Sequence, residues 1–89
     1  MAASPAPQEQ QFIHLVRLAW DLRKRGLGVA IEVPSREQPV LLLARMPGPV
    51  RIMAVALDGR WFFTWGRGRA HRVRALADDA ADRVWEVAQ

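Results

Sequence analysis

The chain of 89 residues contains no cysteine, no tyrosine and no asparagine, and hydroxyl side chains are scarce. Without cysteine it can form neither a disulfide scaffold nor a zinc ribbon, and it has no thiol nucleophile. The hydroxyl side chains are Ser4, Ser35 and Thr64. Neither serine lies in a segment with the rigid support that a nucleophilic serine and its base require. The sequence therefore predicts that the protein is not an enzyme and has no catalytic residue.

Metal ligands and phosphate-binding loops are also missing. Histidine occurs only at positions 14 and 71, far from each other and without an HxH or HxxxH pair. A zinc site needs three or four converging ligands, which this pattern does not supply. The short run Gly66-Arg67-Gly68 matches neither GxxxxGK[ST] nor GxGxxG. We therefore expect no metal site and no cofactor.

Long hydrophobic runs are absent as well. No apolar stretch approaches the roughly 18 residues of a membrane-spanning helix, and residues 1–8 lack the basic start and apolar centre of a signal peptide. Hydrophobic residues make up 51% of the chain and charged residues 25%, as in ordinary globular domains. These features predict a soluble cytoplasmic protein with a flexible tail at 1–8 and a single domain at 9–89.

Two segments have helical periodicity. Between residues 9 and 25, apolar side chains recur at spacings of three and four, and Gly26 then supplies a stop signal after three basic residues. The apolar positions are Phe12, Leu15, Val16, Ala19 and Leu22. A second amphipathic segment runs from Asp78 to the C-terminus, with Asp78 as its expected N-cap.

The segments between these helices have the pattern of strands. We expect strands at 28–33, 40–44, 50–57 and 61–65, with a two-residue hairpin turn at Asp58-Gly59. Residues 66–74 are expected to be a loop or a short extension of the sheet. The predicted fold is α+β in two layers: a helix, a four-stranded antiparallel meander and a helix, with both helices on one sheet face.

Basic residues are concentrated in the middle of the chain. Residues 38–77 contain seven arginines and a single acidic residue, Asp58, whereas residues 78–89 contain one arginine and four acidic residues. Arginines beside aromatic rings are typical of proteins that bind single-stranded nucleic acid. A GC-rich genome also favours arginine over lysine without selection for binding, so both interpretations stay open. The arginines of the nucleic-acid alternative are Arg60, Arg67, Arg69, Arg72 and Arg74.

The hairpin and the start of the last helix resemble a known group of proteins. The segment from Asp58 to Gly66 reads DGRWFFTWG, and residues 77–81 read ADDAA. Both resemble small uncharacterised actinobacterial proteins with a DG-aromatic-W-G hairpin and an Asp-Asp-Ala helix start. This resemblance implies a bacterial cytoplasmic origin and no particular activity.

The aromatic hairpin leads to the main functional expectation. If Trp61, Phe63 and Trp65 point away from the helices, they form an apolar patch on the outer sheet face. The same rings could instead fill the core, and the sequence does not decide between the two. We expect a non-enzymatic interaction module that binds a protein partner or a second copy of itself. Its anchors would be these three rings, with Arg67 and Arg69 at the rim, and nucleic-acid binding is the alternative.

Overall fold

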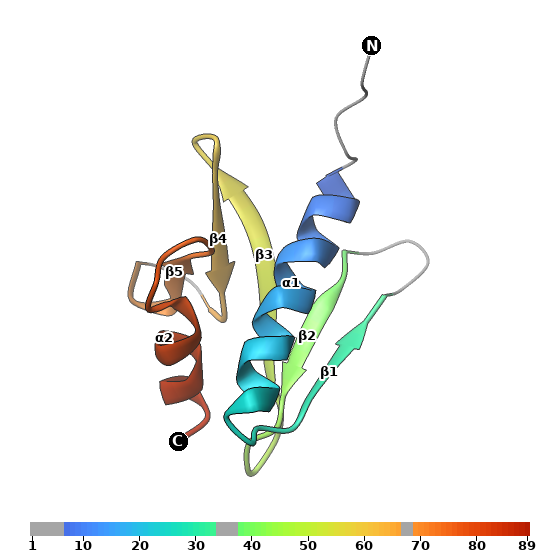
Figure 1. The fold of residues 1–89 in the computed structure, drawn as a ribbon, viewed down its shortest axis with the longest axis vertical. Coiled ribbons are helices and arrows are strands. Elements are labelled where there is room, and N and C mark those ends of the chain that lie inside the picture. Colours follow the sequence, from blue (N-terminus) through green and yellow to red (C-terminus); the bar gives the residue numbers. More distant parts are fainter. Residues whose placement is uncertain (1–6, 34–37, 67–68) are drawn as a thin grey trace.

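The computed structural model describes residues 7–33, 38–66 and 69–89, which form two helices and one antiparallel sheet (Figure 1). The elements are α1 (Pro7–Lys24), β1 (Val29–Glu32), β2 (Val40–Leu43), β3 (Val50–Leu57), β4 (Arg60–Thr64), the 3-10 turn η1 (Arg69–His71), β5 (Arg72–Arg74) and α2 (Ala80–Val87). The α+β class is confirmed. The sheet has five strands in the order β1-β2-β3-β4-β5, so the prediction of four strands is wrong by one.

The additional strand, β5, pairs with β4 on the side of the aromatic hairpin that faces away from β3. Its register places Arg74 opposite Phe62, Val73 opposite Phe63 and Arg72 opposite Thr64. The Trp65 N–H donates to the His71 carbonyl at 3.0 Å, which continues the pairing beyond the strand. A three-residue strand carries too short an alternation to be distinguished from a loop by sequence.

The ends of the helices differ slightly from the prediction. α1 begins at Pro7, two residues before the expected start, because proline fits the first helical position, where an N–H has no partner. It ends as predicted before Gly26, whose φ of +84° only glycine adopts readily. α2 begins at Ala80, so the prediction of Asp78 as N-cap is wrong. Asp79 occupies that position without a side-chain capping bond.

The Asp58-Gly59 turn is confirmed, and it fixes the register of the hairpin. Both residues have positive φ, +52° and +75°, as the two-residue hairpin turn requires. Leu57 therefore lies directly opposite Arg60, and Ala56 lies opposite Trp61. Every residue of β4 is thereby assigned to one face of the sheet.

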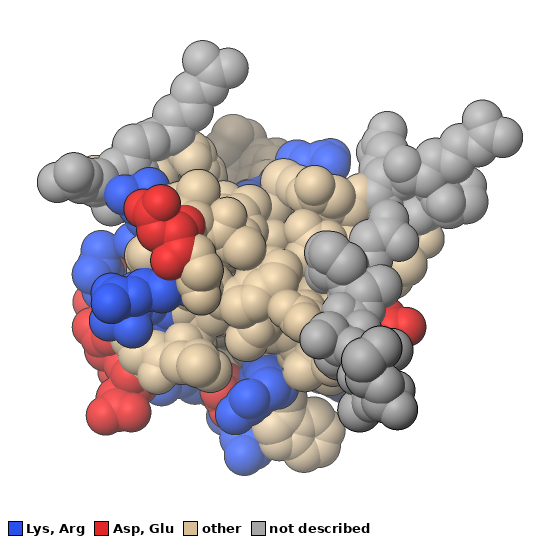
Figure 2. Space-filling model, turned by 90° about the horizontal axis from the view of Figure 1, so that it is seen from above, with Lys and Arg blue, Asp and Glu red and all other residues tan. Residues whose placement is uncertain are grey.

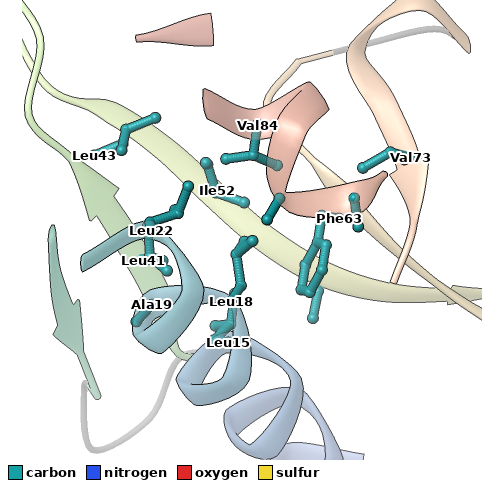
Figure 3. Close-up of a cluster of buried hydrophobic side chains, with 13 residues drawn as sticks. Leu15, Leu18, Ala19, Leu22, Leu41, Leu43, Ile52, Phe63, Val73 and Val84 are labelled. Atoms are coloured by element: carbon teal, nitrogen blue, oxygen red, sulfur yellow. The ribbon is translucent and has the colours of Figure 1, made fainter. Parts of the chain in front are cut away.

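One apolar core lies between the helices and the sheet (Figure 3). Its buried members are Leu15, Leu18, Ala19 and Leu22 from α1, Leu41 and Leu43 from β2, Ile52 and Ala54 from β3, Phe63 from β4, Val73 from β5, and Ala80, Ala81 and Val84 from α2. Residues directly opposite each other on paired strands share a face, as Ala54 and Phe63 do. Both helices therefore pack on the same face, and we call the other face the open face.

Polar contacts attach the helices to their surroundings. The buried Gln11 side chain donates to the Ala54 carbonyl at 3.0 Å, so the polar group that α1 buries has a partner on β3. At the other end of α1, Arg25 forms an ion pair with Asp82 of α2. Within the described residues, neither helix is long and apolar enough to cross a membrane.

Candidate functional site

The three aromatic rings of the expected binding patch lie on the sheet face that the helices cover, opposite the open face. Phe63 is 3% exposed and belongs to the core, and the half-buried Trp61 and Trp65 pack against it. The Trp61 indole Nε1 donates to Gln10 Oε1 of α1 at 3.1 Å. Of the two orientations that the sequence left open, the structure has the one in which the rings face the core, so they do not form an outer apolar patch.

The register of the hairpin explains this orientation. The two-residue turn places Val55 opposite Phe62 and Ala54 opposite Phe63. A small alanine opposite a large ring fits a densely packed layer beneath a helix, where large and small side chains alternate.

The open face presents rows of side chains that each end in an arginine. Across β3, β4 and β5, one row consists of Val55, Phe62 and Arg74. The next row consists of Met53, Thr64 and Arg72, and a third across β1, β2 and β3 consists of Ala30, Leu42 and Arg51. This face therefore combines partly accessible apolar groups with a regular set of cations.

Phe62 is at the centre of the most basic part of the open face. The Arg72 guanidinium lies 5.3 Å from the centroid of its ring, a distance at which cation and ring attract each other. A hollow of about 430 Å³ beside it is lined by Leu57, Asp58, Arg60, Phe62 and Arg72. That volume is within the range of small-ligand sites.

The arginines predicted for the nucleic-acid alternative are partly brought together. Arg60, Arg72 and Arg74 lie on β4 and β5 at the open face. Arg69 begins η1, and Arg67 lies outside the described residues. In the view of Figure 2, charged side chains gather mainly on the left, which is the side of β4, β5 and α2 in Figure 1.

The sequence argument missed four residues of the open face. They are Leu42, Arg51, Met53 and Phe62. For Met53 and Phe62 the sequence did contain a signal, because the Asp-Gly turn fixes which residues of β3 and β4 share a face. For Leu42 and Arg51 there was no comparable signal, because their position depends on the loop between β2 and β3. We call Arg51, Arg60, Arg72 and Arg74 the open-face arginines.

A second hollow lies on the opposite side of the sheet, between α1 and the connection from β5 to α2. It has a volume of about 420 Å³, and its charged lining includes Arg17, Lys24, Asp21 and Asp78. Charges of both signs line it, so it selects for no simple class of ligand. Its size alone does not make it the functional site.

His14 also lines this second hollow and lies against the aromatic hairpin. Its ring centroid is 5.2 Å from that of Trp61. Partial burial, together with the nearby Arg17 guanidinium, holds the pKa of His14 below its ordinary value of 6.5. The folded protein therefore favours neutral His14.

This lowered pKa predicts a pH dependence of stability. As pH falls through about 6.5, His14 binds a proton in the unfolded chain before it does so in the folded protein. The free energy of unfolding should therefore decrease between pH 7.5 and pH 5.5 (roughly one pH unit either side of that value). Urea titrations at both pH values should show the decrease in the wild type and a smaller one in His14→Gln. An identical decrease in the variant would show that other groups cause it.

Among residues 7–33, 38–66 and 69–89, no group of three or more His, Asp or Glu side chains is arranged to hold a metal ion. No protein-family model matches the chain, and no curated protein or solved structure is similar to it at a significant level.

Proposed function

We propose that this chain is a non-enzymatic module whose open sheet face binds single-stranded nucleic acid. The observation that carries the proposal is the arrangement around Phe62, where Arg60, Arg72 and Arg74 surround a ring that is half-buried and still partly accessible. Arginines contact phosphates, and an aromatic ring provides a stacking platform for a base.

The charge distribution favours a polyanion over a neutral protein surface. The described strands place four arginines on the open face, against Glu32 at the β1 end and Asp58, which lines the hollow beside Phe62. Protein interfaces rely on large buried anchors such as tryptophan. The tryptophans of the hairpin pack toward the helices instead. Attraction by the open-face arginines is therefore the main source of affinity.

The proposal predicts binding that depends strongly on salt. A labelled single strand of about 12 nucleotides spans a site of this kind, and fluorescence anisotropy measures its affinity. If three or four arginines contact phosphates, affinity should fall by about 20- to 50-fold between 50 and 200 mM salt. Phe62→Ala should weaken binding by about 10-fold, as loss of one stacked base does, and leave the salt dependence unchanged.

Two control ligands make this experiment decisive. Polyglutamate of matched length tests for an acidic polypeptide partner. A duplex of the same sequence tests whether the protein prefers single-stranded or double-stranded nucleic acid. Equal affinity for polyglutamate and the oligonucleotide would contradict the proposal, and so would salt-independent binding. Preference for the duplex would contradict the stacking role of Phe62.

A further inference from the structure

The two flanks of α1 have opposite character. The flank beside α2 carries the charged side chains that line the second hollow. The other flank is an exposed apolar stripe at positions i, i+1, i+4 and i+8, formed by Phe12, Ile13, Val16 and Trp20. Trp20 is 63% exposed, and the other three are between 40% and 49% exposed. Four large apolar side chains on one helix flank, exposed to solvent, indicate a contact surface.

This apolar flank lies directly beside the free edge of the sheet. A hollow of about 340 Å³ separates the two and is lined by Val16, Ala19, Trp20 and Arg23 of α1 and by Val29, Ala30 and Ile31 of β1. Among the described strands, β1 pairs only with β2, so its other side is an edge. The apolar stripe and the strand edge therefore form one continuous surface.

The backbone of β1 presents hydrogen-bonding groups at this edge. The Gly28 carbonyl accepts from the Ala44 N–H at 2.9 Å, so Gly28 points toward β2. Backbone groups alternate in direction along an antiparallel strand. Ala30 and Glu32 therefore also point toward β2, whereas the N–H and C=O groups of Val29 and Ile31 point outward.

The β1 edge has fewer of the features that prevent strand pairing than the opposite edge of the sheet. Proteins protect free edges with proline, charged side chains, bulges or very short strands. The sequence of β1 is Val-Ala-Ile-Glu, without proline or lysine, and its four residues pair with β2 in unbroken register. The opposite edge, β5, is a three-residue strand with arginine at both ends. Of the two edges, β1 is the one suited to accept another strand.

We propose that a second copy of this chain occupies the surface, with the two β1 strands paired antiparallel about a two-fold axis. Residues opposite each other in such a pair must lie on the same face of the sheet. An axis normal to the sheet at Ala30 meets this condition and places Val29 opposite Ile31 of the partner subunit. Because both residues have outward backbone groups, each such pair exchanges two hydrogen bonds.

The same axis explains why the occupant is a second copy. Rotation about the sheet normal keeps both α1 helices on one side of the joined sheet, so their apolar flanks face each other across the axis. It also places the exposed Glu32 opposite Gly28 of the partner subunit, so like charges do not meet across the strand pair. One self-complementary surface satisfies the strand edge and the stripe, as a two-fold interface requires.

The available area is also adequate. The four stripe residues expose on the order of 400 Å² of apolar surface. The paired strands and Val33, which is 62% exposed, add to this area. A standard interface buries about 800 Å² per subunit, which the stripe and the strand together approach. This inference does not depend on the proposed function, because it uses a different surface.

Sedimentation and hydrogen exchange test the proposal together. The wild type should sediment with a mass near twice 10.1 kDa, and raising its concentration should slow exchange of the Val29 and Ile31 amides. Trp20→Glu, which places a charge in the stripe without touching the core, should weaken the dimer by about tenfold or more. The matched control is Leu76→Glu, since Leu76 is 71% exposed and lies between β5 and α2.

Each outcome decides for or against the proposal. A dimer that Trp20→Glu weakens and Leu76→Glu does not, with concentration-dependent protection at Val29 and Ile31, supports it. A monomer at every concentration overturns it. A dimer that is insensitive to Trp20→Glu, or that leaves the Val29 and Ile31 amides unprotected, shows that another surface associates and also overturns it.

Discussion

Replacing Phe63 with alanine should lower the free energy of unfolding by about 3–5 kcal/mol, as truncation of buried aromatic residues does. Phe63 lies in the centre of the core, opposite Ala54 on one side and Val73 on the other. Its removal leaves a cavity between both helices and the sheet. A domain of this size has a total stability of roughly 5–10 kcal/mol, so the variant should be close to unfolded at 37 °C.

The neighbouring Phe62 provides a matched control. It is the same residue type on the same strand, but it points to the open face and is only half-buried. Phe62→Ala should cost about 1 kcal/mol, the typical effect of a substitution outside the core. Urea titrations followed by tryptophan fluorescence measure both values. Equal losses for the two variants would show that the faces of β4 are assigned incorrectly.

Reversing the charge of three open-face arginines should abolish nucleic-acid binding. In the triple variant Arg60→Glu, Arg72→Glu and Arg74→Glu, three phosphate contacts are replaced by repulsion. Affinity for the labelled single strand at 50 mM salt should fall by more than about 100-fold, since each lost contact also loses its counterion release. The three side chains lie at the open face, away from the core, so the fold should persist.

A second triple variant separates the location of the charges from their number. Arg17→Glu, Lys24→Glu and Arg83→Glu reverse three exposed charges on the helices. Both variants change the net charge from +4 to −2, because each reversal removes two units. If the open face is the binding surface, the helix variant should keep most of the affinity. Similar losses in both variants would mean that net charge alone attracts the oligonucleotide.

Most elements of the fold could be predicted because their signals are local. The period of α1, the stop at Gly26 and the Asp58-Gly59 turn each depend on a few adjacent residues, and the structure contains all three. The short strand β5 could not be separated from a loop. Its alternation covers only Arg72–Arg74, and it is a strand because β4 offers it an edge.

The orientation of the aromatic hairpin is not a local property. Alternation along β4 separates Phe62 from Trp61 and Phe63, but it does not say which side the helices cover. That choice depends on α1, whose Gln10 and His14 side chains contact Trp61. The arginines of the candidate site were found by charge alone, whereas Phe62 needed the register of the hairpin.

The strand order has a consequence for how the chain folds during synthesis. Each strand pairs with the next one along the chain, so every ladder closes a short loop. The sheet can therefore grow strand by strand as residues leave the ribosome, with α1 already available to cover the first strands. Both helices make contacts across long stretches of sequence: Trp61 reaches Gln10 of α1 across 51 residues, and Asp82 of α2, the element synthesised last, reaches Arg25 across 57. Docking of α2 is then the last step, and until it occurs Val73 and one side of Phe63 stay accessible to solvent and to chaperones.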